Sequence, residues 1–153
     1  MLMSSEAARM RPLGYEIKKV REYLANTPNW FLDSSEYVCS SDYLEVALNE
    51  FFVQGLEIDY AAVMWDADFR YNPTLNDWNY FCFDGKQKWR EREEPKYEIK
   101  RFYMKNSYRV LLTRARLGMV IVVPEGASND KTRDPEFYNC TYEYLKSLGL
   151  KEI

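Results

Sequence analysis

The segment from Tyr108 to Pro124, YRVLLTRARLGMVIVVP, constrains the fold most, because it joins an amphipathic helix directly to a short apolar strand. Apolar residues at helical spacing give the predicted helix one buried face: Met104, Tyr108, Leu111, Leu112 and Ala115. We expect Gly118 to end this helix. Met119–Val123 is too short to span a membrane and too uniformly apolar for a half-exposed hairpin strand. It predicts a central parallel strand covered on both faces.

A second apolar run of strand length, Ala61–Trp65, follows a turn at Gln54–Gly55. Before the turn, Tyr43–Asn49 alternates apolar and polar residues as a strand would, although its residues are also compatible with a helix. Two buried strands need cover on both sides, which helices between them would supply. We therefore predict an α/β fold with three layers and a mostly parallel central sheet.

Further helices are predicted towards the two ends of the chain. Residues 1–12 are typical of a strand end, a serine cap and a short helix that stops before Pro12. A helix is also suggested by three apolar residues: Ile17, Val20 and Leu24. Glu136–Leu148 is amphipathic, and we expect Gly149 to cap it. Its predicted buried face consists of Phe137, Cys140, Tyr144 and Leu148.

Composition bounds the class of protein. The 153 residues are 46% hydrophobic and 29% charged with a formal net charge of -3, which predicts one soluble globular domain over residues 1–153. The slightly acidic balance argues against general electrostatic wrapping of nucleic acid, although a local basic groove is compatible with it. The three cysteines are widely spaced and odd in number, which indicates reduced thiols and a cytoplasmic protein without a secretory segment. With no histidine, triads and metal sites that use histidine are excluded.

The residues Val110–Arg116, VLLTRAR, resemble the sixth conserved motif of superfamily 1 helicases. In that motif an arginine acts on the ATP γ-phosphate, and the resemblance implies this role for Arg114. Such an arginine finger can contribute roughly 10³ to 10⁵ in rate. Arg116 would be a second partner for phosphate or carboxylate. A single Thr-Arg-Ala on a helix is also typical of a solvated arginine, so the motif alone leaves both interpretations open.

The stretch Gln54–Glu57, QGLE, resembles the fifth motif of the same helicases. The resemblance implies that Glu57 contacts the nucleotide ribose and that Gln54 and Gly55 form the linking turn. Asn49 and Phe51 stand where many members have Thr and His. If the two motifs precede neighbouring strands, Glu57 and Arg114 should lie at one edge of the sheet, both exposed.

A closer resemblance is to a helicase-like family related to the Schlafen group. Three stretches carry it: Glu50–Glu57, Asn106–Arg116 and Glu136–Tyr138. It implies the second RecA-like lobe of a superfamily 1 P-loop ATPase, with the amino-terminal RecA-like lobe as its missing partner. No GxxxxGK[ST] loop is present, so ATP and Mg²⁺ would bind only with the first lobe. The leading hypothesis is half of an ATP-driven helicase or translocase, and the alternative is a noncatalytic protein-interaction module.

Residues 69–98 form a predicted aromatic and basic insertion. Rings interleaved with cations suit base stacking and backbone contact on single-stranded DNA or RNA. The candidates for this contact are Trp78, Lys86, Lys88, Trp89 and Arg90. Alternatively, the segment is a small hairpin around Asp84–Gly85 whose rings pack on the domain. Just before it, Asp66 and Asp68 are expected to form a strand-end turn in which one of them pairs with Arg70, and a divalent metal site is the alternative.

Overall fold

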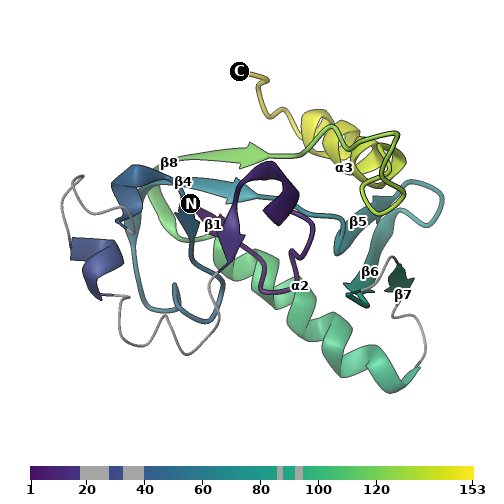
Figure 1. Ribbon diagram of the computed structural model, residues 1–153, viewed down its shortest axis with the longest axis horizontal. Helices are drawn as coiled ribbons and strands as arrows, with labels where there is room; N and C mark the ends of the chain where they lie inside the picture. Colours follow the sequence, from purple (N-terminus) through teal and green to yellow (C-terminus); the bar gives the residue numbers. More distant parts are fainter. Residues whose placement is uncertain (18–27, 33–39, 86–87, 92–94) are drawn as a thin grey trace. The chain divides into compact units, whose positions relative to one another are not determined.

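The computed structural model describes residues 1–17, 28–32, 40–85, 88–91 and 95–153 (Figure 1). The chain divides into two compact units. The first comprises Met1–Ser5, Met10–Met64 and Ser107–Val122, and the second comprises Glu6–Arg9, Trp65–Asn106 and Val123–Ile153. Whether residues 1–153 act as one lobe stays a prediction. Within the described ranges, no helix is both long enough and apolar enough to cross a membrane.

The first unit is built on parallel strands. A three-stranded sheet has the order β1 (Leu2–Met3), β4 (Ile58–Met64), β8 (Ala115–Val122), and β2 (Glu16–Ile17) pairs with β3 (Val46–Ala47). A parallel bridge between Leu2 and Leu48, the residue after β3, links the two sheets. The resulting order is β2-β3-β1-β4-β8, and every pairing is parallel. The predicted α/β class with a mostly parallel sheet is confirmed, while the three-layer, RecA-like arrangement stays a prediction.

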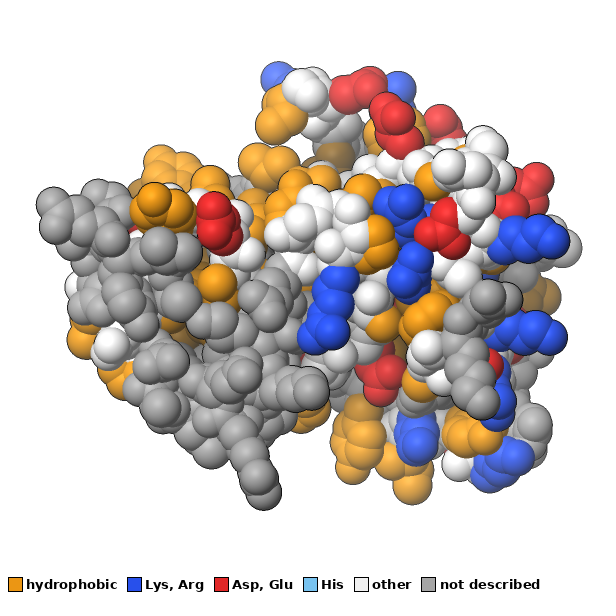
Figure 2. All heavy atoms as spheres, viewed as in Figure 1, with side chains coloured by type: hydrophobic (Ala, Val, Ile, Leu, Met, Phe, Trp, Pro, Cys, Tyr) orange, Lys and Arg blue, Asp and Glu red, His pale blue; other side chains and the backbone are white. Residues whose placement is uncertain are grey.

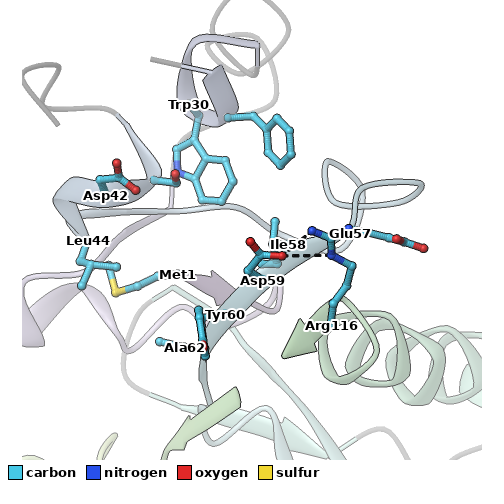
Figure 3. A pocket seen from close by; sticks show the side chains of 12 residues that line it. Met1, Trp30, Asp42, Leu44, Glu57, Ile58, Asp59, Tyr60, Ala62 and Arg116 are labelled. Carbon is cyan, nitrogen blue, oxygen red and sulfur yellow. Dashed lines mark hydrogen bonds and ion pairs between the residues drawn. The ribbon is translucent and has the colours of Figure 1, made fainter. Parts of the chain in front are cut away.

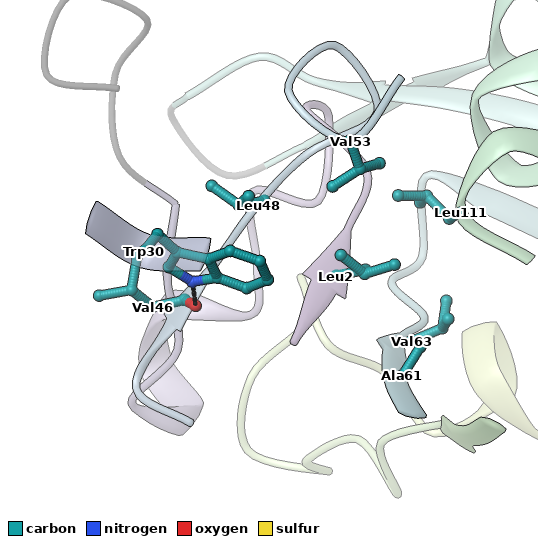
Figure 4. Close-up of a cluster of buried hydrophobic side chains, with 8 residues drawn as sticks. All are labelled: Leu2, Trp30, Val46, Leu48, Val53, Ala61, Val63 and Leu111. Atoms are coloured by element: carbon teal, nitrogen blue, oxygen red, sulfur yellow. Dashed lines mark hydrogen bonds between the residues drawn. The ribbon is translucent and has the colours of Figure 1, made fainter. Parts of the chain in front are cut away.

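Helix α2 (Glu98–Leu112) buries the predicted face, because Met104, Tyr108 and Leu111 are all nearly inaccessible. Leu111 joins a core cluster with side chains from the strands and from the helical residues 28–32 (Figure 4). The cluster consists of Leu2, Trp30, Val46, Leu48, Val53, Ala61, Val63 and Leu111. The Trp30 Nε1 donates to the Val46 carbonyl at 3.0 Å, which satisfies the only polar atom of that ring. Burying each large apolar side chain stabilises the fold by about 1.5–3 kcal/mol.

The helix ends earlier than expected, at Leu112, and the strand begins at Ala115. The Thr113 amide still donates to the Val110 carbonyl at 3.2 Å, but the Arg114 carbonyl accepts from the Ile58 amide at 3.1 Å. The chain therefore leaves the helix to pair with β4. Gly118 lies inside β8, so its predicted role as a helix cap was wrong. A Cβ at Gly118 would come within 3.1 Å of two ring carbons of Tyr60.

The expectation that the apolar strand is central and covered on both faces was also wrong. Among the described residues, β8 pairs only with β4, which makes it an edge strand. Leu117 is 67% and Val120 41% exposed, whereas Val63 of β4 is fully buried. The central strand is therefore β4. An apolar run predicts a strand, but its pattern does not tell a central strand from an edge strand.

The second unit contains an antiparallel sheet of β5 (Phe69–Asn72), β6 (Asp77–Phe83) and β7 (Trp89–Glu91). Strands β6 and β7 form the hairpin expected around Asp84–Gly85. Helix α3 (Glu136–Ser147) packs on this sheet, because the rings of Tyr71 and Tyr144 stack with centroids 4.0 Å apart. Its predicted place over a parallel sheet is therefore replaced by contact with β5.

The buried face of α3 differs from the predicted one. Tyr138, Thr141 and Leu145 are buried, whereas Cys140 and Leu148 are exposed. The Thr141 hydroxyl accepts the Tyr71 amide at 3.1 Å, so a polar residue occupies the sheet-facing side that periodicity assigned to apolar ones. Gly149 follows the helix with φ 88°, and its amide donates to the Lys146 carbonyl, which confirms the expected cap.

Near the amino end the strand β1 is confirmed, but the predicted helix before Pro12 is absent from the described residues. Turns are found there, followed by a 3-10 helix, η1 (Arg11–Leu13), that contains Pro12. Two more 3-10 helices are η2 (Ser41–Tyr43) and η3 (Pro95–Tyr97). Ile17 lies in β2, while Val20 and Leu24 lie outside the described residues. The strand expected over Tyr43–Asn49 is confirmed only for Val46–Ala47.

Candidate functional site

The two motif segments meet at the amino ends of neighbouring parallel strands. Gln54–Glu57 leads into β4, and Thr113–Arg114 leads into β8. The Arg114 Nη1 donates to the Leu56 carbonyl at 3.3 Å. The Arg114 carbonyl, in turn, accepts the Ile58 amide at 3.1 Å. Side chain and backbone of one residue thus join the two segments, and the expected adjacency is found.

The Arg114 guanidinium is half-buried against its own unit. Its Nε donates to the Val110 carbonyl at 3.1 Å, and its Nη2 donates to the Thr113 hydroxyl at 3.1 Å. Within the part of the chain that the structure describes, no carboxylate pairs with it. A cation beside the free carbonyls of a helix end is favourable, because those carbonyls carry partial negative charge. Arg114 therefore holds an uncompensated positive charge next to the motif turn.

The turn before β4 presents its polar side chains to solvent. Gln54, Gly55 and Glu57 are all exposed, as expected for Glu57. Gly55 has φ 81°, a conformation that favours glycine and allows the chain to reverse into β4. Asn49 shapes the start of the turn, because its side-chain oxygen accepts the Phe51 amide at 3.1 Å. The glycine of the motif is thus explained by backbone conformation.

Glu50 is a structural part of this site to which the sequence assigned no role. It is 3% exposed and accepts three hydrogen bonds. The donors are the Ser5 amide at 2.9 Å, the Ser5 hydroxyl at 2.6 Å and the Ser107 hydroxyl at 3.1 Å. The carboxylate therefore ties the end of β1 and helix α2 to the motif turn. The one signal in the sequence was its place at the start of Glu50–Glu57, a stretch that carries the family resemblance.

Arg116 already has a carboxylate partner, Asp59, which the sequence did not identify. Its Nε lies 3.1 Å from Asp59 Oδ1, and its Nη2 donates to the same oxygen. Hydrogen bonding to Asp59 raises the pKa of Arg116. Both side chains are about half exposed, at 56% and 54%, so the pair stays open to solvent.

A hollow of about 650 Å³ lies beside this ion pair (Figure 3). Glu57 and Arg116 line it, whereas Gln54, Gly55 and Arg114 are not among its lining residues. The structure thus brings all the predicted nucleotide-binding residues to one end of β4 and β8. Of these residues, Glu57 and Arg116 line the hollow.

The two tryptophans predicted to stack on bases make contacts within the second unit. The Trp78 ring lies 4.3 Å from Phe69 and 5.2 Å from Trp65, measured between centroids. The Trp89 Nε1 donates to the Thr132 carbonyl at 2.7 Å. These contacts occupy part of each ring, so the role of Trp78 and Trp89 in nucleic-acid binding stays a prediction.

Among the described residues of the same segment, the cations do not form a continuous basic stripe. Lys88 is exposed, and Arg90 lies 3.7 Å from Asp84. Lys86 lies outside the described residues. On the visible face in Figure 2, basic side chains alternate with acidic and hydrophobic ones. A contact of these residues with nucleic acid would therefore be local.

Asp66 belongs to a buried polar network in the second unit. It accepts the Arg9 amide at 2.8 Å and the Tyr138 hydroxyl at 3.0 Å, and burial raises its pKa. Arg70 donates to the Ala67 carbonyl at 2.7 Å, and the charges of Asp66 and Asp68 act on it, in line with the expected strand-end turn. Burial lowers the pKa of Arg70 to about 10. In the described ranges, no group of three acidic or cysteine side chains could hold a metal ion.

Comparison with known proteins gives one match. The model of a protein family described as Schlafen group 3, DNA/RNA helicase domain, matches residues 1–125. No curated protein and no solved structure matches the chain. The matched residues include the five parallel strands, both motif segments and the buried Glu50.

Proposed function

The chain belongs to the Schlafen group 3 DNA/RNA helicase domain family, and from this premise we propose that it is the second, RecA-like lobe of an ATP-dependent helicase or translocase. In this proposal the missing amino-terminal lobe supplies the P-loop, and ATP and Mg²⁺ bind only when both lobes are present. The partner polymer is single-stranded DNA or RNA, and the setting is cytoplasmic. Two findings support the proposal: the match to a helicase-domain family and the parallel sheet of the first unit.

One observation carries the proposal: the Arg114 side chain bridges to the turn that presents Glu57. We assign Arg114 as the arginine finger and Glu57 as the ribose contact. Gln54 and Gly55 form the turn that links the two segments, and Arg116 is the second charged partner. The residues fit half of a nucleotide site, because a cation and an exposed carboxylate lie on adjoining segments.

The proposed chemistry of this half-site is electrostatic. A guanidinium stabilises the charge that develops on phosphoryl oxygens during transfer. Arg114 suits this task, since no carboxylate among the described residues neutralises it, and its contact with Leu56 at 3.3 Å is long for a hydrogen bond. Exchanging that contact for a phosphate oxygen would cost little.

The test uses a polypeptide in which this chain is preceded by a P-loop lobe of the same family. ATP turnover stimulated by single-stranded nucleic acid is measured for the unmodified protein, Arg114→Ala, Arg114→Lys and the control Arg109→Ala. Arg109 is an exposed arginine of α2, the helix that precedes Arg114. We expect Arg114→Ala to lower kcat by roughly 10³ and Arg114→Lys to restore little, because lysine lacks the planar fork. The control should retain its kcat.

The alternative function is a noncatalytic protein-interaction module. It is favoured by the fact that every hydrogen bond described for Arg114 goes to its own unit. If Arg114 serves only to hold the two segments together, Arg114→Ala will lower the melting temperature and leave kcat unchanged. That result would exclude the arginine-finger role, whereas no turnover by the unmodified two-lobe protein would support the interaction module.

A further inference from the structure

The hollow beside the Arg116–Asp59 pair combines two kinds of surface. One part is apolar and aromatic, with Phe31, Leu44 and Tyr60 all substantially exposed. The other part is acidic. Among the described residues that line the hollow, three carboxylates, Asp42, Glu57 and Asp59, stand against one guanidinium, that of Arg116. The excess of carboxylates over guanidinium groups among these residues favours a cation as the ligand of this surface.

Two carboxyl groups of the hollow retain capacity to accept hydrogen bonds. Both bonds from Arg116 go to Asp59 Oδ1, and Oδ2 has no partner among the described residues. Asp42 is exposed and has no hydrogen-bond partner in the same set of residues. The existing pair shows that a guanidinium fits against Asp59. A second cation would find acceptors on both sides of the hollow.

Tyr60 adds a flat, accessible ring. It pairs with Gly118 across the sheet, and the absence of a Cβ there lets the ring lie against the backbone of β8. Even so, Tyr60 remains 74% exposed. An aromatic ring held on one side and open to solvent attracts a planar cation through its negative face.

The second unit already contains an arginine that stacks on aromatic rings near carboxylates. In the second unit, the Arg70 guanidinium carbon lies 3.8 Å from the ring centroid of Phe81 and 3.6 Å from that of Phe137. The carboxylates of Asp66 and Asp68 are close enough to raise the pKa of Arg70 against the effect of burial. Rings and carboxylates together thus accommodate an arginine in this protein.

From the unpaired acceptors, the exposed ring and the excess of carboxylates, we propose that the hollow is a docking site for an arginine-bearing segment of a partner protein. An arginine of this segment stacks on Tyr60, and Asp42 and the open oxygen of Asp59 supply carboxylate partners for the cations of the segment. Arginine is preferred to lysine, because its planar fork suits both ring and carboxylate. This site does not use Arg114, but it shares Glu57 and Arg116 with the proposed nucleotide half-site.

The experiment follows backbone amide signals of the isotope-labelled chain by nuclear magnetic resonance. The probes are three short peptides that are otherwise uncharged and carry two arginines, two lysines or two glutamates. We expect the arginine peptide to shift signals around Tyr60, Asp42 and Asp59, the lysine peptide to bind more weakly, and the glutamate peptide not to bind. High salt should weaken binding, because the charges are exposed.

Three variants test the assignment. Tyr60→Ala and Asp42→Asn, both at exposed positions, should weaken binding of the arginine peptide by about 3- to 30-fold, as expected for loss of a cation–π contact or an ion pair. Tyr103→Ala is the control, because Tyr103 is an equally exposed ring of α2 that does not line the hollow. Unchanged affinity in both Tyr60→Ala and Asp42→Asn would overturn the proposal. So would a thymidine oligonucleotide that shifts the Tyr60 signals while the arginine peptide does not.

Discussion

Arg114 donates from Nη1 to the carbonyl oxygen of Leu56 at 3.3 Å, and this contact joins two segments that lie far apart in the sequence. The join is reinforced by the backbone, since the Arg114 carbonyl accepts the Ile58 amide. A substitution in either segment is therefore expected to change the conformation of the other. This coupling makes the region suitable for a site whose two halves must move together, and it also means that stability must be measured alongside activity.

We expect the isolated chain to hydrolyse no ATP above background, with or without single-stranded nucleic acid. The reason is that its sequence lacks a GxxxxGK[ST] loop, whose backbone N–H groups bind the nucleotide phosphates. The measurement is phosphate release over time by the isolated chain and by its Arg114→Ala variant. Robust turnover by the isolated chain that disappears in Arg114→Ala would contradict the half-site proposal.

Val63→Asp should unfold the first unit, whereas Val120→Asp should not. Val63 is fully buried in the central strand, so an unpaired charge there costs several kcal/mol, a large part of a typical stability of about 5–15 kcal/mol. Val120 is 41% exposed on the edge strand, where the charge keeps much of its hydration. Circular dichroism during urea unfolding is the measurement. Equal losses in the two variants would mean that β8 is covered as fully as β4.

Glu50→Ala should lower the free energy of unfolding by about 2 kcal/mol or more. The substitution removes the acceptor of three hydrogen bonds and leaves the Ser5 amide without its carboxylate partner. Glu45→Ala is the control, because Glu45 is an exposed glutamate close to Glu50 in the sequence. Urea unfolding measures both. If the two variants are equally stable, Glu50 does not anchor the motif turn.

Asp130→Asn should remove an acid-sensitive part of the stability of the second unit. Hydrogen bonds from the Thr132 hydroxyl and amide, and from Arg133 and Arg9, hold the pKa of Asp130 well below its usual range. Because the folded pKa lies below the unfolded value of about 3.9, the carboxylate stabilises the fold above that pH. This stabilisation is lost as the pH falls through the folded pKa.

The measurement for Asp130→Asn is urea unfolding at pH 7, 5 and 3. The difference in free energy of unfolding between the unmodified chain and Asp130→Asn should be largest at pH 7 and should shrink at pH 3. Glu143→Gln, at an exposed position of α3, serves as the control. A difference that stays constant over this pH range would show that Asp130 contributes through shape and not through its charge.

Trp78→Ala should destabilise the second unit by about 3–5 kcal/mol, as large-to-small substitutions among packed rings do. Its ring contacts Phe69, Trp65 and Tyr144. Lys88→Ala, at an exposed position, should change stability by no more than about 0.5 kcal/mol. Thermal unfolding and binding of a single-stranded oligonucleotide are measured together. Lost binding without lost stability in Trp78→Ala would instead favour the base-stacking role.

Local sequence patterns predicted the helices, strands and turns of this chain well where a pattern is compatible with a single kind of structure. The buried face of α2, the strand at Ala61–Trp65, the hairpin around Asp84–Gly85 and the glycine after α3 all follow from spacing or from turn chemistry. The same reasoning placed the motif residues next to neighbouring strands. Their catalytic and binding roles are not decided by these patterns and stay predictions.

Tertiary pairing decided the features that the patterns left ambiguous. Gly118 could cap a helix or lie in a strand, and it lies in β8 because pairing with β4 begins at Ala115. At Gly118 itself, the ring of Tyr60 occupies the space that a Cβ would need. Likewise, periodicity placed Cys140 on the buried face of α3, but a hydrogen bond from the Tyr71 amide turns Thr141 inward. Both outcomes depend on a partner from another part of the chain.

By itself, then, the sequence determined an α/β chain with parallel strands and two motif segments beside them, because periodicity and turn residues act over a few neighbouring positions. Only the tertiary structure decided which strand is central, that Glu50 is buried beneath the motif turn, and that Arg116 is held by Asp59. Those outcomes depend on contacts between residues more than 40 positions apart. Such contacts form only when burial of the shared core brings the segments together.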